Sequence, residues 1–353
     1  MSGNPFDVTW LFSGTWDFFV VGDHIASRCW LESSGLGYAL LQQTFCFIDE
    51  RTTMTLTRFP LVRLLFSAAV FLGLGSNAMA ADQEKLWQVS EGLDGPESAY
   101  YDAESGFVFL SHVGNGGADQ EKNGFISKLT LQGKMVKLKW FEGLQDPKGV
   151  RSHKGTLWVS DVTRIVAVDI KSGKQVEEVA IQGAAFLNDL TTGPDGTVYV
   201  ADMVKSTIHQ YKNGKQSVFD SGEHLEHPNG LLVVGQTLYV GAWGTGFNPE
   251  DFSTKVLGRF FSVDLKTKKK TLITQKPTGH LDGVEVDGQG GFIVTDWIHG
   301  KVFHITKAGS VSLLQQYEKG AADHAYLPAT QTLLLPHMLD NTLTAFKLGN
   351  LPK

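Results

Sequence analysis

The sequence predicts an all-β protein, a six-bladed β-propeller with four antiparallel strands in each blade. The first observation is a recurring pattern, clearest in His227 to Trp243. A polar residue and a glycine lead into a short apolar strand, a tight turn and a second β-branched and aromatic strand. Asn188 to Asp202 and Leu281 to Trp297 repeat the pattern. The second observation is that no long stretch of helical periodicity follows residue 81.

The third observation is the spacing of the repeats. They open near residues 97, 146, 188, 229, 282 and 324, so successive openings are 49, 42, 41, 53 and 42 residues apart. Periods of about 40–50 residues with four strands each are typical of propeller blades. The two longer spacings predict insertions at residues 114–123 and 244–252. We expect the second insertion to lie over or beside the mouth of the channel.

Taken in order, the strands fill every blade but the last. Lys85–Ser90 alternates polar and apolar residues, which predicts a half-buried strand. Blades one and two continue with strands at residues 106–111, 124–129, 134–141, 156–161 and 164–169. Blade six has only 332–336 and 341–347 after its opening, one strand too few. We expect Lys85–Ser90 to complete it, because closing the ring with the chain's own start removes exposed sheet edges.

Composition agrees with this fold and restricts the partners. Charged residues are 19% of the 353 residues and aromatic residues 11%, with 39 glycines, which is typical of an all-β protein with many turns. The formal net charge of −6 argues against nucleic acid or an anionic membrane as the main partner. The expected partner is a small-molecule substrate.

Residues 54–80 have the features of a secretory signal peptide. Two arginines without an acidic residue precede an apolar run from Leu64 to Leu74, and the segment ends in Ala78-Met79-Ala80. The run is shorter than the about 20 residues that a membrane span needs. We expect cleavage after Ala80 and a periplasmic or secreted mature chain, residues 81–353, with no membrane span. An uncleaved anchor is the alternative.

Residues 1–53 stand upstream of this signal, although signal peptides begin at the start codon. The stretch is rich in Trp, Phe and Gly and has no repeat. We interpret it as upstream sequence translated from a misplaced start or as a disordered extension; a cytoplasmic extension before an anchor is the alternative. Both cysteines, Cys29 and Cys46, lie here. The mature chain is therefore predicted to have no disulfide, thiolate metal site or cysteine nucleophile.

The residues that open the repeats are candidates for a metal site. The innermost strand of each blade lines the central channel, so these residues converge at one end of the axis. Four of them offer oxygen ligands: Glu97, Asn188, Asn229 and Asp282. Two carboxylates and two amide carbonyls form a hard-oxygen cage that suits Ca²⁺ or another divalent cation. One Asn-Gly or Asp-Gly pair alone is more simply a turn, but four at equivalent positions favour a metal.

At these positions the sequence resembles a known family. The motifs that carry the resemblance are Gly95-Pro96-Glu97-Ser98, Asn188-Asp189 with Gly193-Pro194-Asp195-Gly196, Pro228-Asn229-Gly230-Leu231 and Leu281-Asp282-Gly283-Val284. They resemble those of the regucalcin/gluconolactonase (senescence marker protein, LRE-like) family of six-bladed propellers, and more distantly those of paraoxonases and strictosidine synthases. The resemblance covers the predicted mature chain at the level of blades.

The resemblance implies a site and an activity. Glu97, Asn229 and Asp282 would bind one divalent cation, Ca²⁺ in the first place, with Zn²⁺, Mn²⁺ or Mg²⁺ as alternatives. Asn188 would lie beside the cation and help bind substrate or water. The family mostly hydrolyses lactones, so the implied chemistry is polarisation of the lactone carbonyl and attack by an activated water. Asp282 is the first candidate for the base, and Asp189, more simply a turn residue, is the second.

One position departs from the family pattern. Sugar-lactone members commonly have an arginine two residues before the blade-three asparagine, where this chain has Phe186. A bulky apolar residue in place of a guanidinium favours a less hydroxylated substrate, and it also fits a chain without activity.

Several histidines and tryptophans also stand near the repeat openings. His227 is a candidate for substrate binding, and His227, His280 and His324 are candidate general bases whose simpler role is to form hydrogen bonds in the channel. We interpret His299 and His337 as structural. The tryptophans Trp158, Trp243 and Trp297, each of which closes a second strand, are interpreted as blade-packing residues.

Two functions of different classes follow. The first is a secreted, metal-dependent hydrolase of a lactone or related cyclic ester. The alternative is a non-catalytic propeller of the NHL type that binds a ligand or protein, with a structural cation in its channel. From residue 81 onward the chain has no Gly-x-Ser-x-Gly, Walker loop, dinucleotide fingerprint or Cys/His zinc spacing.

Overall fold

The structure, a computed structural model, describes residues 14–21, 24–31, 83–114 and 123–352. The chain divides into two compact units, Met1–Gly75 and Ser76–Lys353. In the first unit, β1 (Gly14–Val21) and β2 (His24–Leu31) form an antiparallel hairpin. The predicted signal peptide, residues 54–80, and most of the predicted insertion at 114–123 lie outside the described residues. The assignment of residues 1–53 and the cleavage after Ala80 stay predictions.

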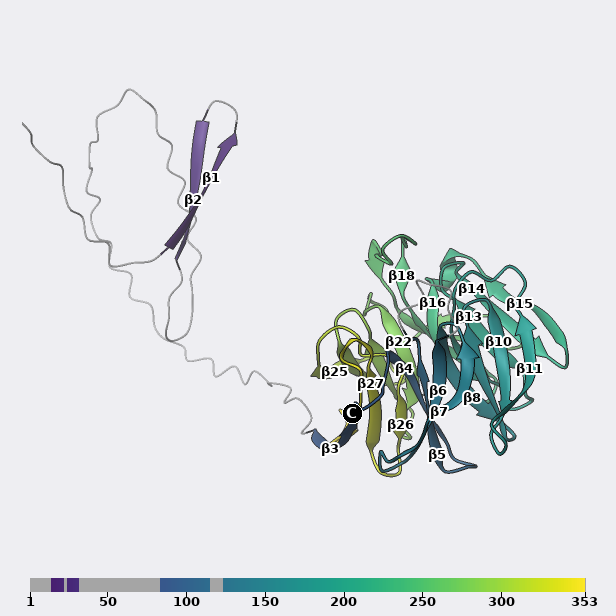
Figure 1. Ribbon diagram of the computed structural model, residues 1–353. Coiled ribbons are helices and arrows are strands. Elements are labelled where there is room, and N and C mark those ends of the chain that lie inside the picture. Colours follow the sequence, from purple (N-terminus) through teal and green to yellow (C-terminus); the bar gives the residue numbers. More distant parts are fainter. Residues whose placement is uncertain (1–13, 22–23, 32–82, 115–122, 353) are drawn as a thin grey trace, which may run out of the picture. The chain divides into compact units, whose positions relative to one another are not determined.

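The second unit is a six-bladed propeller of four-stranded antiparallel sheets (Figure 1). Blades one to three are β4 (Pro96–Asp102), β5 (Phe107–His112), β6 (Gly124–Thr130) and β7 (Met135–Leu144); β8 (Pro147–His153), β9 (Thr156–Asp161), β10 (Arg164–Asp169) and β11 (Lys174–Ala180); and β12 (Leu187–Thr192), β13 (Val198–Asp202), β14 (Thr207–Lys212) and β15 (Lys215–Ser221). The predicted fold class is confirmed.

The remaining blades follow the same plan, with one insertion. They are β16 (Pro228–Val234), β17 (Thr237–Ala242), β20 (Phe260–Asp264) and β21 (Lys270–Leu272); β22 (Leu281–Val286), β23 (Phe292–Asp296), β24 (Lys301–Ile305) and β25 (Val311–Gln316); and β26 (Ala325–Leu327), β27 (Thr332–His337), β28 (Thr342–Lys347) and β3 (Glu84–Val89). The insertion in blade four forms the small hairpin of β18 (Gly244–Thr245) and β19 (Val256–Leu257). The helical segments of the described residues are two short 3₁₀ turns, Glu223–Leu225 and Met338–Asp340, so no described helix is long and apolar enough to cross a membrane.

The ring is closed by the N-terminal strand of the propeller, as the sequence predicts. Strand β3 pairs antiparallel with β28, from Leu343 opposite Val89 to Lys347 opposite Glu84. In Figure 1 the dark blue β3 lies beside the yellow C-terminal strands. Blade six therefore combines residues from both ends of the propeller, and its pairing leaves no half-filled sheet at the seam.

The core lies between neighbouring blades. Ala201 and Ile208 of blade three, for example, share one buried cluster with Leu231 and Leu238 of blade four. Inner and middle strands are buried, whereas outer strands such as β11 are exposed along most of their length. Burial of one such leucine or isoleucine contributes about 1.5–3 kcal/mol, so contacts between blades provide most of the apolar stabilisation.

Five inner strands share one irregularity at the channel end. In β4 the register runs from Pro96 opposite His112 to Ala99 opposite Leu110, so two residues of the inner strand face one residue of the next strand. The same shift occurs in β8, β12, β16 and β22. Such a β-bulge bends the strand and changes the direction of its side chains. The first bulge residues are Glu97, Lys148, Asn188, Asn229 and Asp282.

The second bulge residue explains the glycines of the repeated motif. A Cβ atom at Gly283 would lie 2.6 Å from Asp323 Oδ1, and one at Gly230 would overlap the carbonyl oxygen of Asp282. Neither glycine has a positive φ. These positions therefore require glycine because neighbouring inner strands approach closely around the axis. The simpler interpretation of a single Asn-Gly or Asp-Gly pair as a turn does not apply to Asn229-Gly230 and Asp282-Gly283, which lie within β16 and β22.

We expect Gly230→Ala to destabilise the propeller strongly. The added methyl group collides with the backbone of Asp282 on the neighbouring inner strand, which cannot move without opening the ring. Overpacking of this kind costs about 1–3 kcal/mol or more in the free energy of unfolding, measured by urea denaturation. Gly193→Ala is the matched control, because the closest atom to its Cβ would be in the side chain of Asp195, at 3.1 Å, and its next contacts, with Thr197 and Tyr199, would be at an ordinary 3.6 Å. Equal losses for both variants would contradict the steric explanation.

Candidate functional site

The five first bulge residues meet in one cavity at an end of the channel. The cavity has a volume of about 270 Å³. Residues of all six blades line it: Glu97, Lys148, Phe186, Asn188, Met203, Asn229, Trp243, Asp251, Phe252, Asp282, Trp297, Ile298, Lys319 and Met338. The structure thus brings together the four oxygen-bearing residues that the repeat pattern singled out.

Several oxygen atoms in this cavity have no hydrogen-bond partner. Glu97 Oε2, Asn188 Oδ1 and Asn229 Oδ1 are all buried and unpaired among the described residues. The amide of Asn229 donates its N–H to Asp282 Oδ1 over 3.1 Å, so the Asn229 side chain is oriented with its carbonyl oxygen free. A buried acceptor without a partner costs about 1–3 kcal/mol. Three of them in one cavity indicate that a cationic or hydrogen-bonding ligand belongs there.

The charge of the cavity supports the same conclusion. Burial raises the pKa of Glu97 well above its usual range, and the charge of Asp282 raises it further. Burial likewise raises the pKa of Asp282, with a contribution from Asp323. The ammonium group of Lys148 acts in the opposite direction on both carboxyl groups. Anionic charge therefore exceeds cationic charge here, a situation that a bound divalent cation relieves.

The donor set fits a divalent cation. Carboxylate oxygens of Glu97 and Asp282 and the carbonyl oxygen of Asn229 are hard ligands of the kind that Ca²⁺ prefers. Asn188 Oδ1 provides a fourth unpaired oxygen from the next blade. The described lining contains no cysteine and so offers no thiolate ligand; its sulfur atoms are the thioethers of Met203 and Met338.

Lys148 is the site residue that sequence reasoning missed. Its ammonium group is buried in the cavity lining, 2.6 Å from Asp146 Oδ1 and 4.9 Å from the ring centre of Phe186. A signal was present in the sequence, because Lys148-Gly149 stands where other blades have Asn229-Gly230 and Asp282-Gly283. The predicted opening of the second repeat, residue 146, lies two residues before the bulge residue Lys148.

Aromatic side chains form much of the cavity wall. Trp243 and Trp297, which were interpreted as blade-packing residues, both line the cavity, so that interpretation is incomplete. The insertion of blade four contributes Asp251 and Phe252, as its predicted place beside the channel mouth implies. The indole N–H of Trp243 donates to the carbonyl oxygen of Phe252 over 2.8 Å and holds the insertion against the blade.

Phe186 occupies the position of the family arginine and faces the cavity. Its ring packs against Phe252 with 5.4 Å between ring centres. Cationic groups enter the cavity from elsewhere, namely Lys148 and Lys319. The ammonium group of Lys319 lies 4.9 Å from the ring centre of Trp297.

None of the three candidate histidines belongs to the described cavity lining. His227 is buried, its Nδ1 lies 2.7 Å from the carbonyl oxygen of Met203, and its ring stacks on Phe247. His324 is fully buried, and burial lowers the pKa of its imidazole to about 4. His280 stands behind Trp243, with 5.0 Å between the two ring centres.

A buried ionic network lies further along the inner strands, where Arg151 and Glu285 each follow a first bulge residue by three positions. Arg151 Nη1 lies 3.3 Å from Asp323 Oδ2, and Arg151 Nη2 lies 3.2 Å from Glu285 Oε1. The hydroxyl of Ser98 also donates to Asp323, over 2.5 Å. Because these groups come from blades one, two, five and six, the network joins inner strands across the axis. The network therefore fixes the arrangement of buried charge on the inner strands that also carry the cavity residues.

Asp189, the second candidate for the base, has a structural role in the described residues. Its carboxylate accepts the backbone N–H groups of Leu190 and Leu231, each over 2.7 Å. Since Leu231 belongs to β16, the carboxylate links blades three and four. Asp189 is absent from the described cavity lining.

Comparison with solved structures places the fold among several enzymes. A gluconolactonase from Xanthomonas campestris shares 16% sequence identity with a TM-score of 0.56, over 77% of this chain and 93% of its own. A virginiamycin B lyase from Staphylococcus aureus shares 14% with a TM-score of 0.53, over 76% of this chain and 100% of its own. A luciferin-regenerating enzyme shares 13% with a TM-score of 0.53, over 77% of this chain and 96% of its own.

Sequence comparison gives a more specific result. No curated protein matches the chain. The family model of the SMP-30/gluconolactonase/LRE-like region matches residues 142–324, which hold the inner strands of blades two to five. The match spans just over half of the 353 residues, and the first bulge residues Lys148, Asn188, Asn229 and Asp282 lie inside it. This chain therefore belongs to the SMP-30/gluconolactonase/LRE-like family.

Proposed function

We propose that this chain hydrolyses a lactone or related cyclic ester, with a divalent cation held at the channel mouth by Glu97, Asn229 and Asp282. The observation that carries the proposal is the set of buried, unpaired oxygens of Glu97, Asn188 and Asn229 in one cavity. Membership of the family and the excess of anionic charge around Glu97 support it.

The cation, when bound, supplies a Lewis acid for the ester carbonyl. The chain's own groups then have distinct tasks. Asn188 Oδ1 accepts a hydrogen bond from the attacking water or from the substrate. The ammonium group of Lys148 provides positive charge near the carbonyl oxygen as that oxygen becomes negative. Asp282 is the candidate base, because a carboxylate whose pKa burial raises accepts a proton more readily.

The cavity walls favour a substrate with an apolar or aromatic body. Phe186, Phe252, Trp243 and Trp297 offer rings, whereas few side chains in the described lining can donate several hydrogen bonds to sugar hydroxyls. Lys148 and Lys319 add positive charge at the cavity. We therefore propose a lightly hydroxylated lactone, and preferably one with an acidic or carbonyl-rich substituent, as the substrate class.

We expect chelation to abolish hydrolysis of alkyl- and aryl-substituted lactones by the purified protein, and Ca²⁺, Zn²⁺ or Mn²⁺ to restore it. Asp282→Asn and Glu97→Gln should lower kcat/KM by about 10²-fold or more, because each removes a ligand oxygen charge. Release of acid from each lactone is the measurement, and δ-gluconolactone is the comparison substrate.

The control for these variants is Asp264→Asn, a change at a half-buried carboxylate that ends β20 and is absent from the described cavity lining. Calorimetry with the same ions accompanies the assay. Tight cation binding without turnover of any lactone or ester in the panel would contradict the hydrolase and favour the non-catalytic propeller.

Lys148→Met tests the group that stands near the carbonyl oxygen. Removal of one oxyanion donor costs about 10²–10³-fold in kcat, so we expect a fall of that order with a small change in KM. Lys319→Met removes the other lysine of the cavity lining and should mainly raise KM for anionic substrates. A Lys148→Met enzyme with unchanged kcat would remove this residue from the mechanism.

We also propose that the protein acts outside the cytoplasm after removal of residues 54–80. The basic, apolar and small-residue segments before Ala81 support this. Expression from Met54 in a bacterial host should give periplasmic protein whose N-terminal residue, by terminal sequencing, is Ala81. Protein that keeps Met54 and sediments with membranes would indicate the uncleaved anchor instead.

A further inference from the structure

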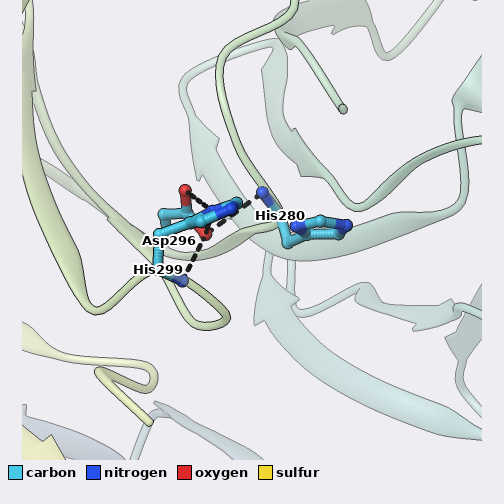
Figure 2. Close-up of side chains that lie close together, drawn as sticks. All are labelled: His280, Asp296 and His299. Carbon is cyan, nitrogen blue, oxygen red and sulfur yellow. Dashed lines mark hydrogen bonds and ion pairs between the residues drawn. The ribbon is translucent and has the colours of Figure 1, made fainter. Parts of the chain in front are cut away.

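Three side chains behind the cavity wall form a group that the proposed reaction does not use. His280 stands directly before β22, Asp296 ends β23, and His299 lies in the turn that follows. The pairing of Leu281 with Asp296 brings the two segments together. Figure 2 shows the three residues next to one another, with dashed lines from the Asp296 carboxylate to His299 and to the backbone N–H of His280.

The group has the composition and closeness of a metal site. Each residue offers one ligand atom, and these atoms all lie within 4.8 Å of one another. Ligand atoms in a tetrahedral zinc site are roughly 3.3 Å apart, as follows from bonds of about 2.0–2.1 Å. Side-chain rotations that move each ligand atom by about 1 Å would therefore bring the three atoms to the spacing of a zinc site. Within the part of the chain that the structure describes, no other three His, Cys, Asp or Glu side chains come as close.

His299 is held by the carboxylate of Asp296. Its Nδ1 lies 2.8 Å from Asp296 Oδ2, and Asp296 is only 1% exposed. In this contact Nδ1–H donates to the carboxylate, and loss of that proton on metal binding makes Nδ1 and the carboxylate adjacent ligands. His299 is partly exposed, so an ion has access from solvent.

His280 provides the second observation. Its side chain is 8% exposed, its Nε2 lies 3.0 Å from the hydroxyl oxygen of Thr254, and its Nδ1 has no hydrogen-bond partner. With its proton on Nε2, the ring donates to the hydroxyl oxygen of Thr254 and presents an unused lone pair on Nδ1. Such a buried, unpaired nitrogen is unfavourable unless a ligand occupies it.

Other blades show which part of this arrangement is only structural. Asp161 and Asp202 end the equivalent strands β9 and β13, accept backbone N–H groups of the preceding loop, and pair with Arg164 and His209. Asp296 accepts the backbone N–H of His280 in the same way, over 3.3 Å. The carboxylate and one arginine or histidine partner are thus a feature of several blades. The second imidazole is present in blade five, and it turns a structural pair into a three-ligand group.

We propose that His280, Asp296 and His299 bind a borderline transition-metal ion, with Zn²⁺ as the representative, at a site separate from the central oxygen cage. Two imidazoles and a carboxylate suit zinc better than Ca²⁺, which prefers an all-oxygen shell. Three protein ligands leave one position for water. The hydrogen bond from His280 to Thr254 connects the ion to the insertion that carries Asp251 and Phe252 of the cavity wall. A bound ion would therefore stiffen that wall.

The test uses the purified full-length chain and Zn²⁺ itself, and it does not depend on lactonase activity. Asp282→Asn first weakens the central cage, and zinc titration by calorimetry then reports the second site. In this background we expect one zinc ion per chain, and a loss of about tenfold or more in affinity for His299→Ala and for His280→Ala. His224→Ala is the matched control, because it removes an exposed histidine that pairs with Asp220 but has no third ligand.

Two further readouts separate metal binding from a purely structural role. Co²⁺ in place of Zn²⁺ should give visible absorption that disappears in His299→Ala, and Zn²⁺ should slow amide exchange in residues 250–256. If His280→Ala fails to fold, the partly exposed His299 decides the outcome. Equal zinc affinity in His299→Ala and His224→Ala, or no zinc bound in the Asp282→Asn background, would overturn the proposal. Failure of the lactonase assay alone leaves this result unaffected.

Discussion

The structure depends on the β-bulge that five inner strands share at the channel end. Each bulge places two residues opposite one, so that the first side chain points to the axis and the second meets the neighbouring inner strand. Close approach of the strands requires glycine at positions such as Gly230 and Gly283. The ligand positions and the packing of the ring are therefore consequences of one backbone feature. A substitution that disturbs the bulge disturbs both.

Charge is concentrated along the axis that these bulges create. Glu97, Asp282 and Asp323 are nearly fully buried, and Arg151 and Lys148 are the buried cations beside them. Burial raises the pKa of Glu97 and of Asp282, and the charges of neighbouring carboxylates raise it further. The divalent cation that we propose for this site would offset that concentration of negative charge. The zinc-type group at blade five lies outside this axis and has nitrogen ligands, so the two sites differ in chemistry as well as in place.

Much of the fold could be predicted because the same strand pattern occurs six times, so that the assignment of each segment is supported by the others. Six similar segments predicted the blade, their number predicted the ring, and the shortage in blade six predicted the closing strand, which is β3. Glu97, Asn188, Asn229 and Asp282 could be found because they stand at equivalent repeat positions. Lys148 has the same place in the repeat, but a lysine is not an oxygen ligand and therefore does not extend the ligand pattern of the other blades. Trp243 and Trp297 were assigned to packing because an aromatic residue at the end of a strand has no sequence mark that distinguishes a blade contact from a cavity wall.

The sequence by itself determined the all-β class, the number of blades and the set of oxygen-bearing residues, since these follow from periodicity and residue type. Only the tertiary structure decided which atoms lack partners, how the insertion of blade four reaches the cavity, and that Lys148 shares the cavity with the carboxylates. It also brought His280 next to Asp296 and His299, which strand register alone accomplishes. The physical reason is that the burial and hydrogen bonds of a residue depend on neighbours from other blades. These neighbours are distant in the sequence, so the residues next to it in the chain do not determine them.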